Sequence, residues 1–253
     1  MKLFLQLIYI SFALLMGLNS CQKSFDPDTG TVKLTFVNKV KGSPLILNTQ
    51  AYTNPFNESY TVSKFKYYVT NVSLHGIGAS ADENNSYHLV DAASPASLSF
   101  YFETGPNTFS TLQFLLGVDS TRNVSGAQTD ALDPLNDMFW TWNSGYVMAK
   151  LEGNSPQSNQ AGQKIEYHIG GFKGGNSVLK TITLPFPPNK VAKITPGKTC
   201  EIVIEADLDS WWHTPNNIKI ANLPVCTTPG SLAKRVADNY SKMFTITDVL
   251  NNQ

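Results

Sequence analysis

Short runs of alternating or continuous hydrophobic residues recur along the chain between residues 31 and 206. From Thr31 to Val40 the residues alternate, which places Val32, Leu34 and Phe36 on one face. The run from Tyr60 to Leu74 is rich in aromatic and β-branched residues. Both patterns are typical of β-strands. Further strands are predicted at Tyr87–Val90, Leu98–Phe102, Thr111–Val118, Gly145–Leu151, Lys164–Ile169, Val178–Leu184 and Cys200–Ala206.

These segments predict an all-β fold with one helix near the C-terminus. Roughly ten short strands separated by Gly, Pro and Asn favour an antiparallel β-sandwich of immunoglobulin-like architecture. The helix is expected to begin at Ser231 as its N-cap, and to pack against a sandwich edge. Its apolar stripe has helical spacing: Leu232, Val236, Tyr240 and Met243. No repeat or long linker divides residues 31–253, so we expect one domain.

The N-terminal residues have the pattern of an export signal. Lys2 provides a positive start, Leu3 to Met16 is mostly apolar, and small residues follow. This order is typical of a secretory signal over residues 1–20. The sequence Leu18-Asn19-Ser20-Cys21 resembles a bacterial lipobox, so we expect lipidation at Cys21, with residues 21–30 as a polar tether. Ordinary signal cleavage that happens to leave a cysteine is the alternative.

Export and lipidation would place the protein in a bacterial cell envelope, facing the periplasm or the cell surface. No other hydrophobic segment is long enough to span a bilayer, so membrane attachment is expected through lipid alone. The full chain has 253 residues, 15% of them charged, and a formal net charge of zero. Without a basic run there is no electrostatic footprint for nucleic acid, which we exclude as a partner.

Two cysteines remain if Cys21 carries lipid. In an oxidising compartment an isolated pair most often forms a disulfide, so we expect a bond between Cys200 and Cys226. A soft copper site built from the two thiols is the alternative, although no histidine lies near either cysteine at ligand spacing.

The segment from Asp137 to Gly153 is the most unusual in the chain. It holds two of the four tryptophans, Trp140 and Trp142, and two of the five methionines. Filling the sandwich core is the usual role of such residues. Because so many of these residues occur in one segment, a binding role is a second hypothesis beside the core role.

The same segment carries a family resemblance. The run FWTWNSGYVMAKLEG (139–153), followed by Tyr167-His168-Ile169-Gly170-Gly171, resembles the pattern of the copper-binding MbnP-like family of exported proteins. The central elements are W-x-W-x-x-G-Y and H-x-G. Supporting segments are FKYYVTNV (65–72), FLLGVD (114–119) and ADNYSKMF (237–244), which together extend over nearly the whole mature chain.

The resemblance implies an exported, non-catalytic copper-binding or copper-handling lipoprotein. It also implies a site of histidines and an oxidised tryptophan, kynurenine, produced by a diheme peroxidase-type partner. Carried over to this chain, His168 is the best-matched ligand, and Trp140 and Trp142 are the tryptophans of the matching element. Imidazole and thioether ligands suit copper better than carboxylates do.

The remaining histidines add little to this ligand set. Trp211-Trp212-His213 places a tryptophan and a histidine close enough in sequence to face one ion, so His213 is a further candidate, although a plain loop fits equally. His75 and His88 lie in or beside polar loops and are expected to face solvent. No H-x-H or H-x-x-H spacing occurs.

Enzyme motifs are missing from the sequence. It contains no G-x-S-x-G, H-E-x-x-H, Walker A or G-x-G-x-x-G element, and we therefore expect no catalytic activity. A second hypothesis is a metal-free surface module that binds glycans or other ligands through exposed tryptophans. The two hypotheses differ in geometry: sugars need exposed coplanar rings, whereas copper needs a tryptophan close to His168.

Overall fold

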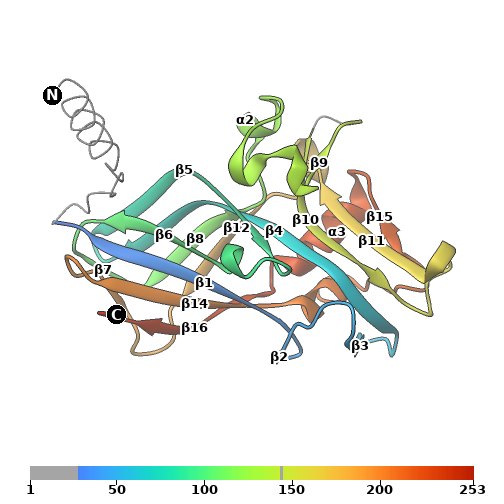
Figure 1. Cartoon of the computed structure of the whole chain (residues 1–253), viewed down its shortest axis with the longest axis horizontal. Coiled ribbons are helices and arrows are strands. Elements are labelled where there is room, and N and C mark those ends of the chain that lie inside the picture. The colour runs from blue at the N-terminus through green and yellow to red at the C-terminus, as the bar shows by residue number, and fades with distance from the viewer. Residues whose placement is uncertain (1–27, 143–144) are drawn as a thin grey trace, which may run out of the picture.

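The computed structural model describes residues 28–142 and 145–253, which form a nine-stranded, a five-stranded and a two-stranded β-sheet with short helical connections (Figure 1). The strands are β1 Gly30–Val40, β2 Ser43–Pro44, β3 Ala51–Thr53, β4 Ser59–Gly76, β5 Ala79–Asp91, β6 Ser99–Thr104, β7 Thr108–Phe109, β8 Thr111–Leu116, β9 Phe139–Trp140, β10 Gly145–Asn154, β11 Lys164–Gly170, β12 Lys180–Pro185, β13 Ala192–Lys193, β14 Thr199–Asp207, β15 Val225–Cys226 and β16 Phe244–Leu250. The α-helices are α2 Ser120–Asn123 and α3 Ser231–Tyr240, and the 3₁₀ turns are η1 Pro95–Leu98, η2 Asp130–Leu132, η3 Pro134–Asn136, η4 Ala161–Gln163, η5 Gly174–Asn176 and η6 Leu208–Trp212.

The long strand β4 organises the larger sheet. Nine strands follow the order β12-β8-β4-β10-β11-β15, with β3 and β5 also paired to β4 and β9 paired to β10. Register shifts on β4 fall between Thr70 and Val72, and on its partner β10 between Glu152 and Gly153. Such irregularities bend a strand and increase its twist, so this sheet curls rather than lying flat.

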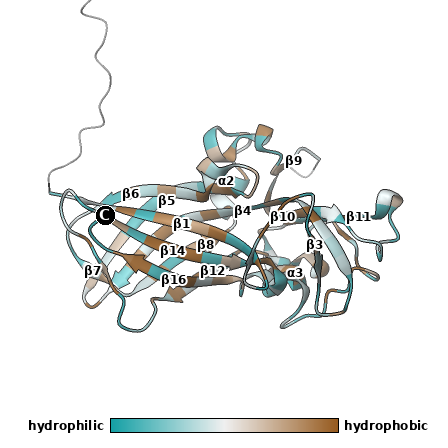
Figure 2. Ribbon diagram, turned by 60° about the horizontal axis from the view of Figure 1, so that its bottom comes forward, coloured by the Kyte–Doolittle hydropathy of each residue, from teal (hydrophilic) through white to brown (hydrophobic). Residues whose placement is uncertain are grey.

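The smaller sheet faces the inside of that curl. It has five strands in the order β16-β14-β1-β2, with β6 also paired to β1. Hydrophobic and hydrophilic residues alternate along β1, β14 and β16 (Figure 2), because successive side chains of a strand point to opposite faces. The apolar face of this sheet closes the core against β4 and β8.

Phe36 of β1 lies at the centre of the contact between the sheets. Its ring centroid is 6.0 Å from Tyr67 on β4, 6.3 Å from Phe114 on β8 and 6.4 Å from Phe244 on β16. These are edge-to-face contacts, and Phe36 is 1% exposed. The alternation predicted for Thr31–Val40 is thereby confirmed.

The fold is mostly β with a helix near the C-terminus, as predicted, but strand direction differs from the expectation. β1 pairs with β14 in parallel over nine residue pairs, and β11 pairs with β15 in parallel. An antiparallel immunoglobulin-like sandwich is therefore not shown by this topology. Alternation in a sequence predicts which face of a strand is buried, and it carries no information on the direction of the neighbouring strand.

The C-terminal region contains one element more than predicted. Helix α3 begins at Ser231, but its N-cap is Gly230 and no side chain caps it, so the predicted capping role of Ser231 is wrong. Val236 and Tyr240 are buried as expected, whereas Leu232 is only partly buried. After the helix, Phe244–Leu250 forms the edge strand β16, whose short alternation was not recognised in the sequence.

Cys200 and Cys226 are free, buried thiols, so the predicted disulfide is wrong. Cys200 pairs with Val32 at the start of β14 in the five-stranded sheet, and Cys226 pairs with Tyr167 at the β15 edge of the other sheet. The two thiols thus belong to different sheets, and β14 and β15 are not neighbours in either one, which does not support the copper site built from both thiols. Burial raises the pKa of each thiol to about 11.

The expectations for the signal peptide, residues 1–20, and for lipidation at Cys21 lie outside the described residues. Of the predicted tether, only residues 28–30 are described. Among the described helices, none is long and apolar enough to cross a membrane.

Replacing Phe36 by Ala tests the contact between the two sheets. We expect the free energy of unfolding to fall by about 3–5 kcal/mol, because the substitution removes a fully buried ring and leaves a cavity. Tyr101→Ala on β6 is the control, since Tyr101 is 56% exposed and its loss should change stability by less than about 0.5 kcal/mol. Urea denaturation measures both. Equal losses in the two variants would contradict this description of the core.

Candidate functional site

The outer face of β4, β10 and β11 carries His168. Lys66 on β4 pairs with Lys150 on β10, and Lys150 pairs with His168 on β11. Directly opposed residues of paired strands project to the same face, so these three side chains form one row on the face that points away from the core. Lys150 is almost completely buried there, at 2% exposed.

The connection from α2 to β9 covers part of this face. Tyr68 donates a hydrogen bond to the Ala131 carbonyl at 3.0 Å, and Tyr146 donates to the Leu132 carbonyl at 2.7 Å. Lys66 donates to the Asn136 carbonyl at 3.2 Å. Two tyrosines and a lysine of the sheet thus hold the connection in place, and the connection in turn leads into Trp140.

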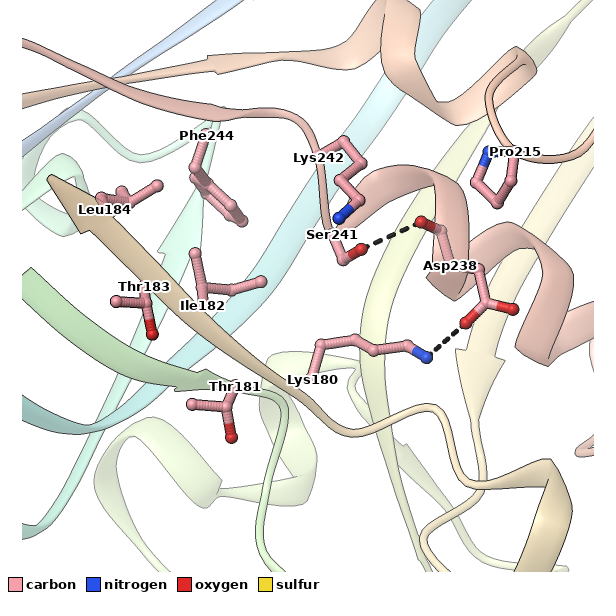
Figure 3. A pocket seen from close by; sticks show the side chains of 10 residues that line it. All are labelled: Lys180, Thr181, Ile182, Thr183, Leu184, Pro215, Asp238, Ser241, Lys242 and Phe244. Carbon is pink, nitrogen blue, oxygen red and sulfur yellow. Dashed lines mark hydrogen bonds and ion pairs between the residues drawn. The ribbon is translucent and has the colours of Figure 1, made fainter.

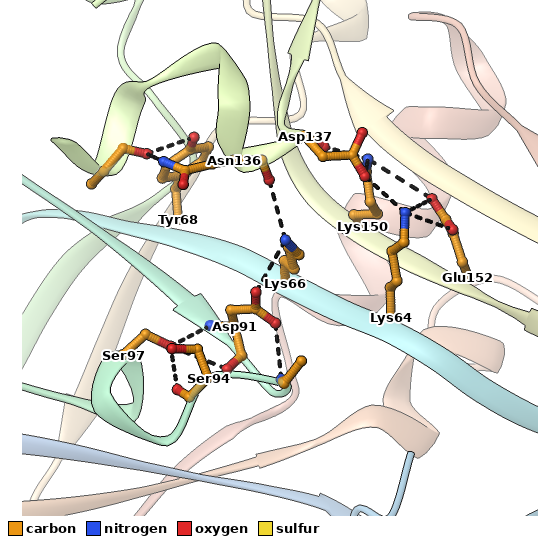
Figure 4. Close-up of polar contacts among 12 residues, drawn as sticks. Lys64, Lys66, Tyr68, Asp91, Ser94, Ser97, Asn136, Asp137, Lys150 and Glu152 are labelled. Carbon is orange, nitrogen blue, oxygen red and sulfur yellow. Dashed lines mark hydrogen bonds and ion pairs between the residues drawn. The ribbon is translucent and has the colours of Figure 1, made fainter. Parts of the chain in front are cut away.

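Five residues beneath this connection form a linked set of ion pairs, here called the charged strip: Lys64, Lys150, Asp137, Glu152 and His168. Figure 4 shows the first four of them. Asp137 accepts from Lys64 at 2.8 Å and from Lys150 at 2.9 Å. Glu152 lies 3.2 Å from Lys64 and 2.9 Å from His168 Nε2. Each carboxylate therefore neutralises two cationic or donor groups.

The charged strip lowers the pKa of both acids. The hydrogen bond from His168 and the charge of Lys64 bring the pKa of Glu152 to about 2, against the opposing effect of burial. For Asp137, burial opposes ionisation, but the pairs with Lys64 and Lys150 outweigh it and bring the pKa to about 2. Both acids are ionised at neutral pH, so Glu152 can only accept and His168 must donate its Nε2–H.

Trp140 lies on the same face of β11 as His168. A Cβ atom added to Gly170 would meet the Trp140 ring at 2.5 Å, so the indole rests directly on that glycine. Gly170 is two residues beyond His168, and residues two apart in a strand share a face. The W-x-W and H-x-G elements of the sequence are thus brought together at Gly170.

Trp142 is placed differently from Trp140. It is 62% exposed, whereas Trp140 is 7% exposed. The two ring centroids lie 5.3 Å apart and the ring planes are inclined by 41°. One exposed ring beside a buried, tilted one does not provide the coplanar platform on which a sugar would stack.

The predicted role of His213 in the same site is not supported. His213 lies 3.3 Å from Asp209 and bonds to Thr214 at 3.0 Å, at the end of η6 rather than on the face that carries His168. Trp211 and Trp212 beside it are each 1% exposed. Their rings pack at 4.9 Å on Tyr240 and Tyr60, respectively, so both tryptophans fill the core and neither is available to sugars.

The other two histidines also have partners of their own. His75 bonds to Ser73 at 2.9 Å. His88 bonds to Glu83 at 3.0 Å and stacks on Phe100 at 3.5 Å. Both are partly buried rather than solvent-facing as expected. Over residues 28–142 and 145–253, no three His, Cys, Asp or Glu side chains gather closely enough to hold a metal ion.

Two hollows lie outside the charged strip. A cavity of about 290 Å³ adjoins Trp140. A wider groove of about 690 Å³ runs between β12 and the turn from α3 to β16, where Lys180 pairs with Asp238 (Figure 3). None of the residues predicted to bind metal lines the groove.

Sequence reasoning missed Glu152, Lys150 and Asp137. A signal was available for the first two, because a lysine and a glutamate two apart in a predicted strand, in an otherwise apolar run, must share a face. Asp137 had no such signal, because its partners come from two distant strands.

The fold and this site define a mostly β protein in which a tryptophan packs over a histidine-bearing strand. A family model described as MbnP matches residues 29–228, and the chain belongs to that family. Among solved structures, the chain is similar to MbnP from Methylosinus trichosporium, with 14% sequence identity over 75% of this chain and 79% of that chain and a TM-score of 0.49. No curated protein sequence matches the chain significantly.

The acids of the charged strip predict a loss of stability at low pH. The pKa of Glu152 is lower in the folded protein than in the unfolded chain, so its contribution is present above about pH 4.5 and lost as the pH falls towards 2. We expect Glu152→Gln to unfold at a lower temperature than the wild type at pH 7, with the difference shrinking between pH 4.5 and 2. Thermal unfolding followed by circular dichroism measures this.

Asp82→Asn, at an exposed carboxylate of β5, is the control and should leave the pH profile of stability unchanged. A wild-type and Glu152→Gln difference that stays constant down to pH 2 would show that Glu152 contributes no charge-dependent stability.

Proposed function

We propose that this MbnP-family protein is an exported, non-catalytic copper-handling protein that binds copper as cargo at His168. The observation that carries the proposal is that the Trp140 ring packs on Gly170 of β11, two residues beyond His168 and on the same face of that strand. This is the arrangement that the W-x-W-x-x-G-Y and H-x-G elements predict, and imidazole is a preferred copper ligand.

Glu152 supports a ligand role for His168. It accepts the Nε2–H of His168 at 2.9 Å, which fixes the tautomer and leaves the Nδ1 lone pair of the neutral ring for a metal. Metal-binding histidines commonly have a carboxylate on the other ring nitrogen, which orients the ring and raises its basicity.

The donor set fits copper held at one imidazole, and it does not fit a closed centre of several histidines. His75, His88 and His213 lie on other elements with their own partners, as described above. Met148, the nearest methionine along β10, is buried and its sulfur accepts the Val118 N–H at 3.1 Å. A single-imidazole site favours exchange of copper over storage, which is consistent with handling rather than catalysis.

The two tryptophans differ as targets for an oxidising partner. Family membership suggests a diheme peroxidase-type partner that converts a tryptophan to kynurenine. Trp142, at 62% exposed, is accessible to such a protein, whereas Trp140 is buried against Gly170. Within this proposal, Trp142 is the residue modified, and Trp140 shields the His168 side of the strand.

The proposal also places the protein in the cell envelope. The signal at residues 1–20 and the lipobox-like sequence before Cys21 support a lipid anchor, with the β domain facing the periplasm or the cell surface.

Copper titration of the purified protein tests the site. We expect one bound copper, measured by competition with a chromophoric chelator, and its loss in His168→Ala. Glu152→Gln should weaken binding by about tenfold, because it removes the carboxylate that orients the ring. His75→Ala is the matched control and should bind as the wild type does. Unchanged stoichiometry and affinity in His168→Ala would remove His168 from the site.

Lipid anchoring is tested by Cys21→Ala. We expect the wild-type protein in the membrane fraction and the variant in the soluble fraction, because the variant cannot be acylated. Immunoblotting of the fractions, with intact mass, measures location and processing. If the variant remains in the membrane with its signal uncleaved, the apolar segment is the anchor and the lipobox interpretation is wrong.

A further inference from the structure

The cavity beside Trp140 has mostly aromatic and glycine walls. Its volume is about 290 Å³, and it is lined by Trp140, Gly145, Tyr146, Gly171, Phe172, Lys173, Asn176 and Pro229. Three of these residues are aromatic and come from three different strands or their ends. Concave sites with apolar walls and a few polar groups are the usual form of small-molecule sites.

The rim of this cavity is held in one conformation. The Val178 N–H bonds to the Gly171 carbonyl at 2.9 Å, and the Ser177 N–H bonds to the Gly174 carbonyl at 3.1 Å, which closes the loop that carries Phe172 and Lys173. Gly171 has a φ of +117°, and a Cβ atom there would lie 3.1 Å from Pro229. A rim fixed in advance lowers the entropic cost of binding.

Few polar groups are free to contact a ligand. The Tyr146 hydroxyl already donates to the Leu132 carbonyl at 2.7 Å. Among the described residues of the lining, the remaining polar side chains are Lys173 and Asn176, both exposed at the rim, and none is a carboxylate. The Lys173 ammonium lies 4.9 Å from the Phe172 ring centroid, so the one charge of the cavity stands directly over an aromatic wall.

From this arrangement we propose that the cavity binds a small planar aromatic carboxylate. The ring of the ligand lies against Phe172 and the exposed edge of Trp140, and its carboxylate pairs with Lys173, with Asn176 as an additional donor. Aromatic walls favour a flat ring, and an ammonium with no ion pair among the described residues favours an anion. At about 290 Å³ the cavity is at the small end of the usual range, which limits the ligand to one or two rings.

A sugar suits this cavity poorly. Each sugar hydroxyl that enters a pocket without a hydrogen-bond partner loses its interactions with water, at a cost of order 1–3 kcal/mol. Lys173 and Asn176, the two polar side chains that the described lining offers beside the bonded Tyr146 hydroxyl, leave most hydroxyls of a sugar ring without a partner. The cavity therefore favours an aromatic acid over the glycan hypothesis.

The inference does not rest on copper binding. Trp140 is shared between the cavity and the proposed copper site, but His168 and Glu152 do not line the cavity. The test is therefore carried out on the metal-free protein in the presence of a chelator, so that failure of one proposal is distinguishable from failure of the other.

Isothermal titration calorimetry with naphthalene-2-carboxylate tests the site, with naphthalene-2-carboxamide as the uncharged matched probe. We expect saturable one-to-one binding of the carboxylate and about tenfold weaker binding of the carboxamide, because the neutral probe lacks the charge-assisted hydrogen bond. Lys173→Gln should weaken the carboxylate by about tenfold and leave the carboxamide unchanged. Phe172→Ala should weaken both probes.

Lys193→Gln on β13 is the matched control, because Lys193 is an exposed lysine outside the cavity. Lys173 is exposed, so Lys173→Gln is expected to keep the fold, and its melting temperature verifies this. The proposal is overturned if the carboxylate does not bind, if both probes bind the wild type equally, if Lys173→Gln binds the carboxylate as the wild type does, or if a methyl glucoside binds in place of both probes.

Discussion

The pairing of β4 with β10 is the constraint on which the rest of the structure depends. It sets Tyr67 opposite Ala149 towards the core and Lys66 opposite Lys150 towards the outer face. A slip of one residue would exchange the two faces and bury the lysines in the core. Gly153 marks where this pairing is tightest, because a Cβ atom there would lie 1.9 Å from the Thr61 carbonyl oxygen. Core, charged strip and His168 row all follow from this one register.

The connection from α2 to β9 can cover the outer face of the sheet because the lysines beneath it are paired with carboxylates. A lysine as buried as Lys150 is costly unless it is paired and hydrogen-bonded. Asp137 supplies both its carboxylate and its backbone carbonyl to Lys150. The same residue, with a left-handed φ of 60°, ends η3 and turns the chain into β9. The residue that neutralises the buried lysine is therefore also the one that directs Trp140 towards Gly170.

Sequence reasoning predicted what depends on local pattern and missed what depends on distant pairing. Local patterns of hydrophobic, aromatic and β-branched residues located β1, β4, β10, β11 and β14, and Trp140 of the tryptophan element packs on Gly170 of the H-x-G element. The direction of β14 beside β1, the partners of Asp137 and the separation of Cys200 from Cys226 depend on how distant segments pair, which periodicity does not encode. The burial of Trp211 and Trp212 was also not predicted. It depends on packing against Tyr240 and Tyr60, which are distant in sequence, and the local sequence does not distinguish a core tryptophan from a surface one.

The two buried thiols have a consequence for how this protein is made. With Cys200 and Cys226 unpaired, the described β domain reaches its final fold without a disulfide between them. Because the thiolate is the reactive form and burial raises each thiol pKa to about 11, the thiols also resist oxidants and mixed disulfides. The described β domain therefore holds its fold without a covalent link between its two sheets through these cysteines.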